Sequence, residues 1–253
     1  MRLKLIGCEV LYRELCAAVS RSVNQVDIEF LPKGLHDKGS AAMLSRLQET
    51  VDRVDATAYE AVLLGYALCG NGLAGLAARS IPLVVPRAHD CITLFLGSRT
   101  RYEEYFRTHS GVYFKTSGWI ERGQNLEPQL SLALDDLVAR YGEEDARYLF
   151  EELTRHYRRL AFIRMGVEPD GSFEERTREL AVERGWEFEA LDGDLGLLRR
   201  LVDGAWDAAD FLVLQPGQRA ASTLGNEVIV AEPAHDHGPG AVSPASAGGE
   251  GPR

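Results

Sequence analysis

The chain has 253 residues, of which 45% are hydrophobic and 26% are charged, the composition of an ordinary globular protein. Its formal net charge of −10 argues against a nucleic-acid-binding surface, although local arginines could still bind a small anionic ligand. It contains no apolar run of about 18 residues, the minimum for a transmembrane helix, and no signal-peptide cleavage site, so we expect a cytoplasmic protein that does not bind membranes.

The first half of the chain alternates between strand and helix patterns. Short apolar runs predict buried strands, and apolar residues spaced three or four apart predict helices. The predicted strands are 3–7, 26–31, 61–66 and 81–85, and the predicted helices are 9–23, 41–54, 73–79, 92–96 and 99–107. This alternation predicts an α/β fold with a Rossmann-like parallel sheet and helices on both faces.

The second half repeats the alternation less regularly. An extended segment is predicted at 111–121, helical sequence at 130–157 with a break near Gly142, strands at 160–165, 186–191 and 211–215, and helices at 173–184 and 194–206. We expect an N-terminal α/β lobe at 1–125 and a second α/β lobe at 126–232, although one lobe wrapped around the other fits equally well. Residues 233–253 are rich in Ala, Gly, Pro and Ser, which predicts a disordered tail.

Three cysteines follow predicted strands of the first lobe. Cys8 follows the strand at 3–7, Cys69 follows that at 61–66, and Cys91 follows that at 81–85 together with His89. The carboxyl ends of parallel strands collect ligands, so these four side chains can converge. In a reducing cytosol such residues are more often ligands, nucleophiles or core residues than disulfides. Thiolate and imidazole groups suit zinc or an iron–sulfur cluster, whereas Cys16 lies on the apolar stripe of a helix and is assigned to the core.

Several polar residues near these cysteines are candidates for substrate binding or catalysis. Asp90 could orient His89 or transfer protons, or it could simply cap the next helix. Glu121 could also transfer protons, or could be an exposed carboxylate. The candidates for binding an anionic substrate are Arg87, Ser98, Arg99, His36 and Asn71. The alternatives are a surface salt bridge for Arg87, an ordinary helix start with Ser98 as its cap for Ser98 and Arg99, and a surface position for His36.

The cysteine-bearing segments carry a resemblance to a known family. The segments are Leu64–Gly72 (LGYALCGNG), Pro86–Thr93 (PRAHDCIT), Leu96–Arg99 (LGSR) and Gly118–Glu121 (GWIE). Together they resemble the DUF1638 family over nearly the whole chain up to about residue 230, and Pro-Arg-x-His-Asp-Cys is the most specific part. The resemblance implies an association with corrinoid-dependent methyltransferases, and therefore a one-carbon setting. It implies no mechanism.

Two weaker likenesses concern the ligands. The His-x-Cys pair is similar to the zinc motif of enzymes that methylate thiols from a corrinoid, and three cysteines from α/β units resemble quinolinate synthase, which holds a four-iron cluster. We therefore expect a zinc-thiolate enzyme acting on a small anionic molecule, with methyl or one-carbon transfer as the leading reaction class. The alternatives are a [4Fe–4S] lyase or redox enzyme, and an accessory protein that binds a metal or a corrinoid and delivers it to a partner.

Overall fold

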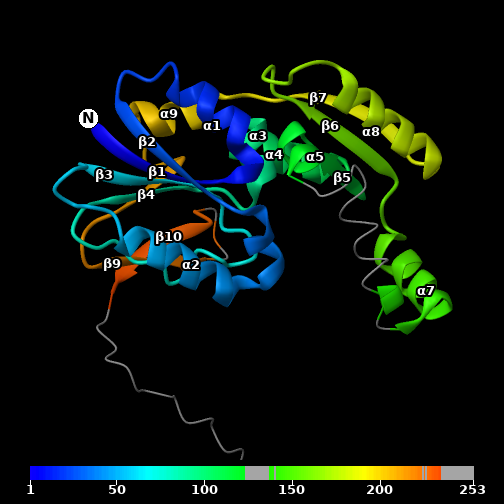
Figure 1. Ribbon diagram of the computed structural model, residues 1–253, viewed down its shortest axis with the longest axis horizontal. Coiled ribbons are helices and arrows are strands. Elements are labelled where there is room, and N and C mark those ends of the chain that lie inside the picture. Colours follow the sequence, from blue (N-terminus) through cyan, green and yellow to red (C-terminus); the bar gives the residue numbers. More distant parts are fainter. Residues whose placement is uncertain (123–136, 140, 224, 226, 235–253) are drawn as a thin grey trace, which may run out of the picture.

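The structure of the protein, a computed structural model, describes residues 1–122, 137–139, 141–223, 225 and 227–234. Its central sheet has the strand order β2–β1–β3–β4–β8 (Figure 1). These strands are β1 (Arg2–Cys8), β2 (Gln25–Leu31), β3 (Ala61–Gly65), β4 (Leu83–Pro86) and β8 (Phe211–Leu214). The first four run parallel to one another, and β8 runs antiparallel to β4. The expected α/β fold with a parallel sheet is therefore confirmed.

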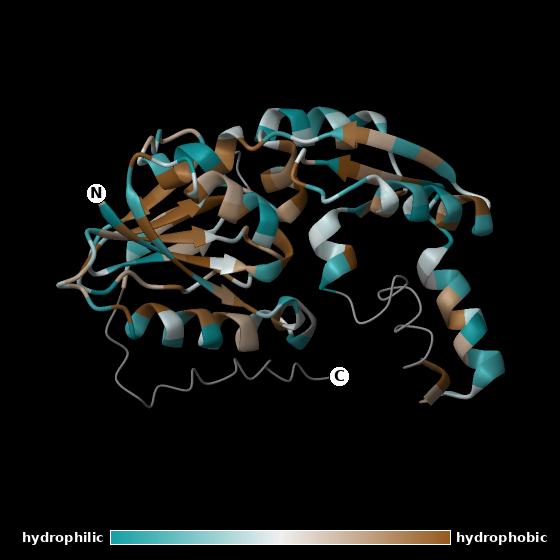
Figure 2. Ribbon diagram, turned by 45° about the horizontal axis from the view of Figure 1, so that its top comes forward, coloured by the Kyte–Doolittle hydropathy of each residue, from teal (hydrophilic) through white to brown (hydrophobic). Residues whose placement is uncertain are grey.

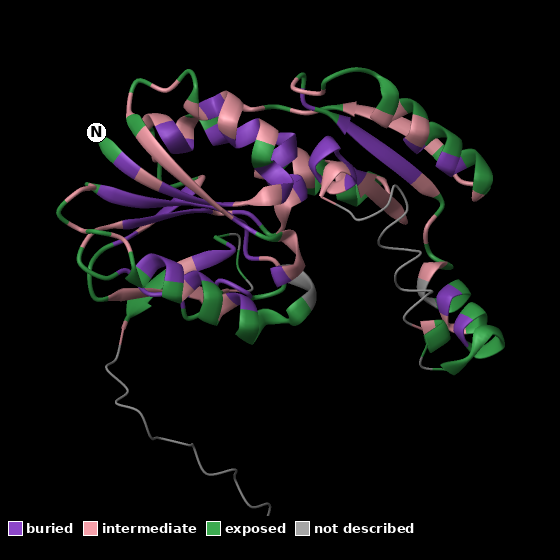
Figure 3. Ribbon diagram, viewed as in Figure 1, coloured by how far each residue is buried: buried purple, intermediate pink, exposed green. Residues whose placement is uncertain are grey.

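The strands of the central sheet direct apolar side chains alternately to its two faces, and both faces are therefore buried. Leu5 and Leu63 belong to the core on one face, and Ile6 and Leu64 to the core on the other. Strands β3 and β4 are buried along their whole length (Figure 3). This is why their sequences are continuous apolar runs, which colour as hydrophobic strands at the centre of the sheet in Figure 2.

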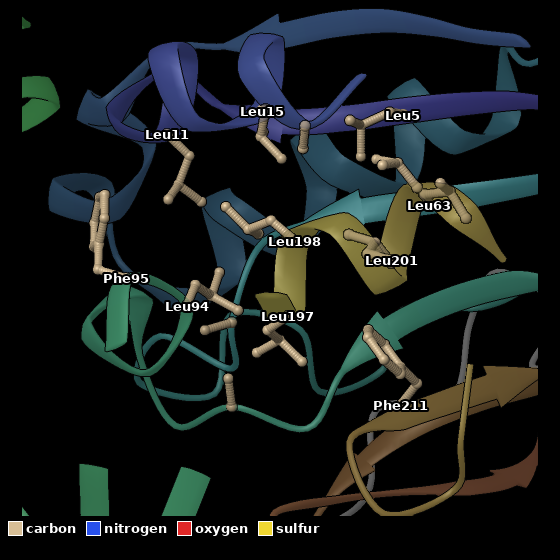
Figure 4. Packing of buried hydrophobic residues seen from close by; sticks show 14 of the residues in the cluster. Leu5, Leu11, Leu15, Leu63, Leu94, Phe95, Leu197, Leu198, Leu201 and Phe211 are labelled. Carbon is tan, nitrogen blue, oxygen red and sulfur yellow. The ribbon is translucent and has the colours of Figure 1, made fainter. Parts of the chain in front are cut away.

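The first face of the sheet is covered by α1 (Tyr12–Val19), α9 (Gly196–Asp203) and α3 (Cys91–Leu96). Figure 4 shows Leu11 and Leu15 beside the α9 leucines Leu198 and Leu201. Gly7 and Gly65 allow α1 to lie close to the strands, because a Cβ at either position would come within 2.7 Å of a Leu15 methyl. Each buried leucine contributes about 2 kcal/mol of hydrophobic free energy.

The second face is covered by α2 (Ser40–Asp52) and by an antiparallel hairpin of β9 (Gln218–Ser222) and β10 (Ile229–Pro233) (Figure 1). Met43 and Leu47 of α2 and Ala220 and Ile229 of the hairpin are buried in its core. The hairpin is not among the predicted elements. The helix predicted at 73–79 is wrong: residues 73–75 form a turn, and Ala77 forms an isolated bridge with Arg219 of β9.

Two features explain why residues 73–79 are not helical. Gly75 has a φ of +98°, which a right-handed helix does not accommodate. The segment's backbone also bonds to β9: the Gly75 amide donates to Ala220 O at 2.7 Å, and the Ala78 amide donates to Gln218 O at 2.9 Å. Long-range pairing has therefore overridden a short helical pattern.

A second sheet contains β5 (Val112–Lys115), β6 (Arg159–Arg164) and β7 (Glu187–Asp192), all parallel. Near it lie α4 (Arg99–Thr108), α5 (Ser117–Glu121) and α8 (Ser172–Glu183), whereas α7 (Glu143–Thr154) projects beyond the end of the sheet. Residues 111–121 are thus a strand followed by a helix, which begins where Thr116 Oγ1 accepts a hydrogen bond from the Trp119 amide at 3.4 Å.

The two sheets do not divide the chain at residue 125. Strand β5 already belongs to the second sheet, while α9 and β8, within the expected second lobe, return to the first. One lobe is therefore inserted into the other, with Ile163 and Met165 of the second packed into the core shared with α1 and α9. The predicted tail falls almost entirely on 235–253, outside the described residues. Over the residues described, no helix is long and apolar enough to span a membrane.

Candidate functional site

Three cysteines lie at one edge of the central sheet. Strands β1, β3 and β4 are adjacent and parallel, so their carboxyl ends share that edge. Cys8 is the last residue of β1, Cys69 lies in the loop after β3, and Cys91 is the first residue of α3 after β4. The three therefore reach the same region from three separate stretches of chain.

The thiols of these cysteines interact with one another. Burial raises the pKa of Cys8 to about 11 and that of Cys69 to about 12, and it holds the pKa of Cys91 well above its ordinary value. After burial, the largest cause for Cys69 is charge on Cys8, and for Cys91 it is charge on Cys69. Thiolates here would therefore repel one another and lack solvation, so without a cation the three groups are neutral thiols.

A small apolar cavity connects the three cysteines. All three line it, together with Tyr66, Lys33 and Trp119 and the apolar side chains of Val10, Leu11, Pro32, Leu35, Met43 and Leu94. The interior has a volume of about 30 Å³, enough for one or two water molecules or a single ion.

The loop that carries Cys69 is strained and firmly held. Cys69 has a φ of +45° and Asn71 a φ of +71°, a region that residues other than glycine seldom adopt. Two backbone hydrogen bonds of 2.9 Å join this loop to the one after β4: the Leu68 amide donates to Ala88 O, and the Cys69 amide donates to His89 O. Such strain persists only where the surroundings enforce it, and it is commonly found at functional sites.

Asp90 fixes the position of Cys91 as a helix cap. Its Oδ1 accepts a hydrogen bond from the Ile92 amide at 3.0 Å, and its Oδ2 accepts one from the Tyr102 hydroxyl at 2.7 Å. Both carboxylate oxygens therefore accept hydrogen bonds, and the alternative expectation that Asp90 caps the next helix is confirmed. Asp90 thus caps α3 and holds Tyr102 beside the site, and it is not among the residues that line the cavity.

His89 does not join the thiols. Its side chain is exposed, does not line the cavity, and stacks on Tyr102 with ring centroids 6.2 Å apart. The expectation that a His-x-Cys pair points to one side needs an extended backbone. Here a helix begins at Cys91, so the two side chains diverge.

The arginines and the serine expected to bind substrate are engaged elsewhere. Arg87 Nη1 donates to the carbonyls of Glu227, at 3.1 Å, and Ile229, which ties β4 to the hairpin. Arg99 forms an ion pair with Glu103 at 3.8 Å. Ser98 Oγ caps α4 by accepting from the Arg101 amide at 3.3 Å.

Glu121 and Asn71 also lie away from the cavity lining. Both Glu121 oxygens accept from Arg13 Nε, at 2.8 and 2.9 Å, so this carboxylate is part of a two-pronged ion pair. Asn71 is exposed. His36 lies in the 3₁₀ helix Lys33–Lys38, but its side chain is outside the described part of the structure.

Two cavity residues, Tyr66 and Lys33, were not among the sequence candidates. Tyr66 is only 4% exposed, and among the described residues its hydroxyl has no hydrogen-bond partner of good geometry. Burial raises its pKa, and so does the neighbouring Cys8 sulfur. Lys33 Nζ lies 5.4 Å from the centre of the Trp119 ring. A tyrosine that ends an apolar strand and a lysine after a proline carry little signal in sequence alone.

A further buried group, Glu14 of α1, lies outside the cavity lining. It is 0% exposed, and neither carboxyl oxygen has a hydrogen-bond partner among the described residues. Burial raises its pKa to about 7, and the carboxylates of Glu168 and Glu121 add to the rise, while Arg13 opposes it.

Comparison with known proteins gives one match. The model of a family described as "Protein of unknown function (DUF1638)" matches residues 30–202, which include Cys69 and Cys91 and leave Cys8 outside. No curated protein matches the chain, and no solved structure matches it.

Proposed function

The chain belongs to the DUF1638 family, whose description names no activity, and we propose that it is a metal-dependent enzyme whose centre is held by Cys8, Cys69 and Cys91. The observation that carries this proposal is the meeting of three thiols, from three adjacent strand ends, around one apolar cavity. A metal supplies the positive charge that three buried thiolates require, and its binding releases their protons.

The kind of metal follows from the ligand set. With His89 turned to solvent, the set contains only sulfur, the ligand of iron–sulfur clusters. No three His, Cys, Asp or Glu side chains of the described chain are placed to hold a single ion, whereas a cluster spans more widely separated sulfurs. We therefore favour a [4Fe–4S] cluster bound by three cysteines, with one iron left open to a small-molecule substrate.

Zinc is the second candidate, because the volume of the cavity suits a single ion, and to bind one the three thiols would have to move closer together. About 30 Å³ accommodates one ion, whereas a cluster requires the lining side chains to move, Met43 being the most adaptable of them. Zinc with three protein ligands keeps a fourth position open, where it acts as a Lewis acid or activates a thiolate.

In either form Cys8, Cys69 and Cys91 would hold the metal, and the metal would supply an open position for substrate chemistry. A cluster there would support lyase or redox chemistry, and zinc would support group transfer. Methyl or one-carbon transfer, a corrinoid protein partner and an accessory role in metal or corrinoid delivery stay predictions from the family resemblance. Thiols in this state require a reducing compartment, so we propose a cytoplasmic location.

The test is metal analysis of protein purified without oxygen. We expect iron and sulfide, with absorbance near 400 nm, in the parent and in the matched control Cys16→Ala, whose thiol does not line the cavity. Cys8→Ala, Cys69→Ala and Cys91→Ala should each lose most of the metal while keeping the parent circular dichroism. Colourless protein with one zinc per chain would select the second candidate. Full metal content in all three variants would overturn the proposal.

A further inference from the structure

The strand register places Tyr66 beside Cys8. Gly7 of β1 is paired with Gly65 of β3. The next residues along these two parallel strands, Cys8 and Tyr66, are therefore neighbours, and both pack against the core on the second face of the sheet. Both also line the cavity, where Tyr66 is only 4% exposed. The register thus holds a phenol against a thiol in apolar surroundings.

The Tyr66 hydroxyl has a sulfur atom as its acceptor. No oxygen or nitrogen atom of the described residues accepts a hydrogen bond from it, although a buried hydroxyl left without a partner is costly. Burial raises the pKa of Cys8, and the hydrogen bond from the Tyr66 side chain lowers it in part. A neutral thiol is a weak acceptor, whereas an ionised one is strong. The contact therefore becomes strongest when Cys8 is deprotonated, as a metal ligand must be.

A second side-chain donor, the Trp119 indole, contacts Cys91. Trp119 lines the same cavity, and its helix α5 is held there because Gly118 packs so closely that a Cβ would lie 1.7 Å from Val10 O. Burial raises the pKa of Cys91, and the hydrogen bond from the Trp119 side chain lowers it in part. The indole N–H is the only donor of that side chain. Two of the three thiols therefore have a side-chain donor on the cavity wall.

We propose that Tyr66 is a positioning residue of the metal centre, whose hydroxyl donates a hydrogen bond to the metal-bound Cys8 thiolate. The Trp119 indole has the same role toward Cys91. Hydrogen bonds to a ligating sulfur disperse its negative charge, so they strengthen metal binding and, in a cluster, raise the reduction potential. This inference rests on the proposed function, because the two donors act on thiolates that a metal holds.

The test compares the anaerobically purified parent with Tyr66→Phe, which removes the hydroxyl and keeps the ring. Tyr59→Phe is the matched control, because the Tyr59 hydroxyl donates to Asp27 Oδ2 at 2.9 Å and does not line the cavity. If the metal is zinc, competition with a chelator should show about tenfold weaker binding by Tyr66→Phe. If it is a cluster, the one-electron potential should fall by about 59 mV, which is the same tenfold factor. Tyr59→Phe should match the parent.

A spectroscopic readout separates this role from a merely structural one. The sulfur-to-metal absorbance band is recorded for the cluster or, in the zinc form, after Co²⁺ replaces zinc. It should move to longer wavelength in Tyr66→Phe, because a sulfur that loses a hydrogen bond gives up its electrons more readily. Trp119→Phe should move the band in the same direction, so the inference is tested even where Tyr66→Phe folds poorly.

The outcomes separate this inference from the proposed function. A metal-loaded parent whose band position and metal affinity or potential are shared by Tyr66→Phe and Trp119→Phe would overturn the inference and leave the metal centre standing. A shift of equal size in Tyr59→Phe would also overturn it. A parent that holds no metal would overturn the proposed function and this inference together.

Discussion

Replacement of the buried Glu14 by glutamine should stabilise the protein, and the gain should depend on pH. Glu14 is 0% exposed, with both oxygens lacking hydrogen-bond partners in the described structure, and burial raises its pKa from 4.5 to about 7. The charged groups that act on it are Glu168, Glu121 and Arg13. Ionised Glu14 is therefore disfavoured in the folded protein and is freely accommodated in the unfolded chain.

The magnitude follows from this difference in pKa. Each tenfold change in proton affinity corresponds to about 1.4 kcal/mol, so a rise from 4.5 to about 7 corresponds to roughly 3 kcal/mol. The sign is that of an acid whose folded-state pKa is raised. The cost is absent below pH 4.5, grows between pH 4.5 and 7, and is complete above pH 7. Glu14→Gln removes it, because glutamine does not ionise.

Urea unfolding at pH 4.5 and pH 8 measures the effect. We expect Glu14→Gln to have the parent's free energy of unfolding at pH 4.5, within about 0.5 kcal/mol, and to exceed it by up to about 3 kcal/mol at pH 8. The control Glu144→Gln, at an exposed position of α7, should differ little from the parent at both pH values. A difference between Glu14→Gln and the parent that is the same at both pH values would refute this reasoning.

Two further substitutions test the framework around the thiols by urea unfolding. Gly118→Ala would place a Cβ 1.7 Å from Val10 O and should lower the free energy of unfolding by about 3 kcal/mol. The control Gly171→Ala has nothing within 4 Å of its Cβ and should lower it by less than about 1 kcal/mol. Equal losses in the two variants would contradict the close contact at Gly118. Asp90→Ala removes the α3 cap and the acceptor of the Tyr102 hydroxyl, and should lower the free energy of unfolding by about 2 kcal/mol. No loss of stability would show that this cap is not needed.

The strands and most helices could be predicted from sequence because their patterns are local. An apolar run such as Ala61–Gly65 encodes a strand buried on both faces, and the spacing in Ser40–Asp52 encodes one buried helix face. The β9–β10 hairpin could not be predicted this way, because Gln218–Ser222 has few apolar residues. The pairing of β9 with the turns around Gly75 is long-range.

The same distinction between local patterns and long-range contacts applies to the candidate site. That cysteines gather at one sheet edge follows from the parallel direction of the strands, which the alternating pattern predicts, and from their order, which it does not. The direction of each side chain beyond a strand depends on where the next element begins, and α3 begins at Cys91, which separates it from His89. Arg87 is captured by the carbonyl of Ile229 in the unpredicted hairpin. The Tyr66 hydroxyl becomes informative only once its burial is known.

The most direct test of the metal centre is diffraction from crystals of anaerobically purified protein, recorded at the absorption edge of the metal that analysis detects. We expect one anomalous peak per chain at this sheet edge, with the Sγ atoms of Cys8, Cys69 and Cys91 each about 2.3 Å from a metal atom. A peak at another position, or a bound metal to which these sulfurs are not ligands, would contradict it.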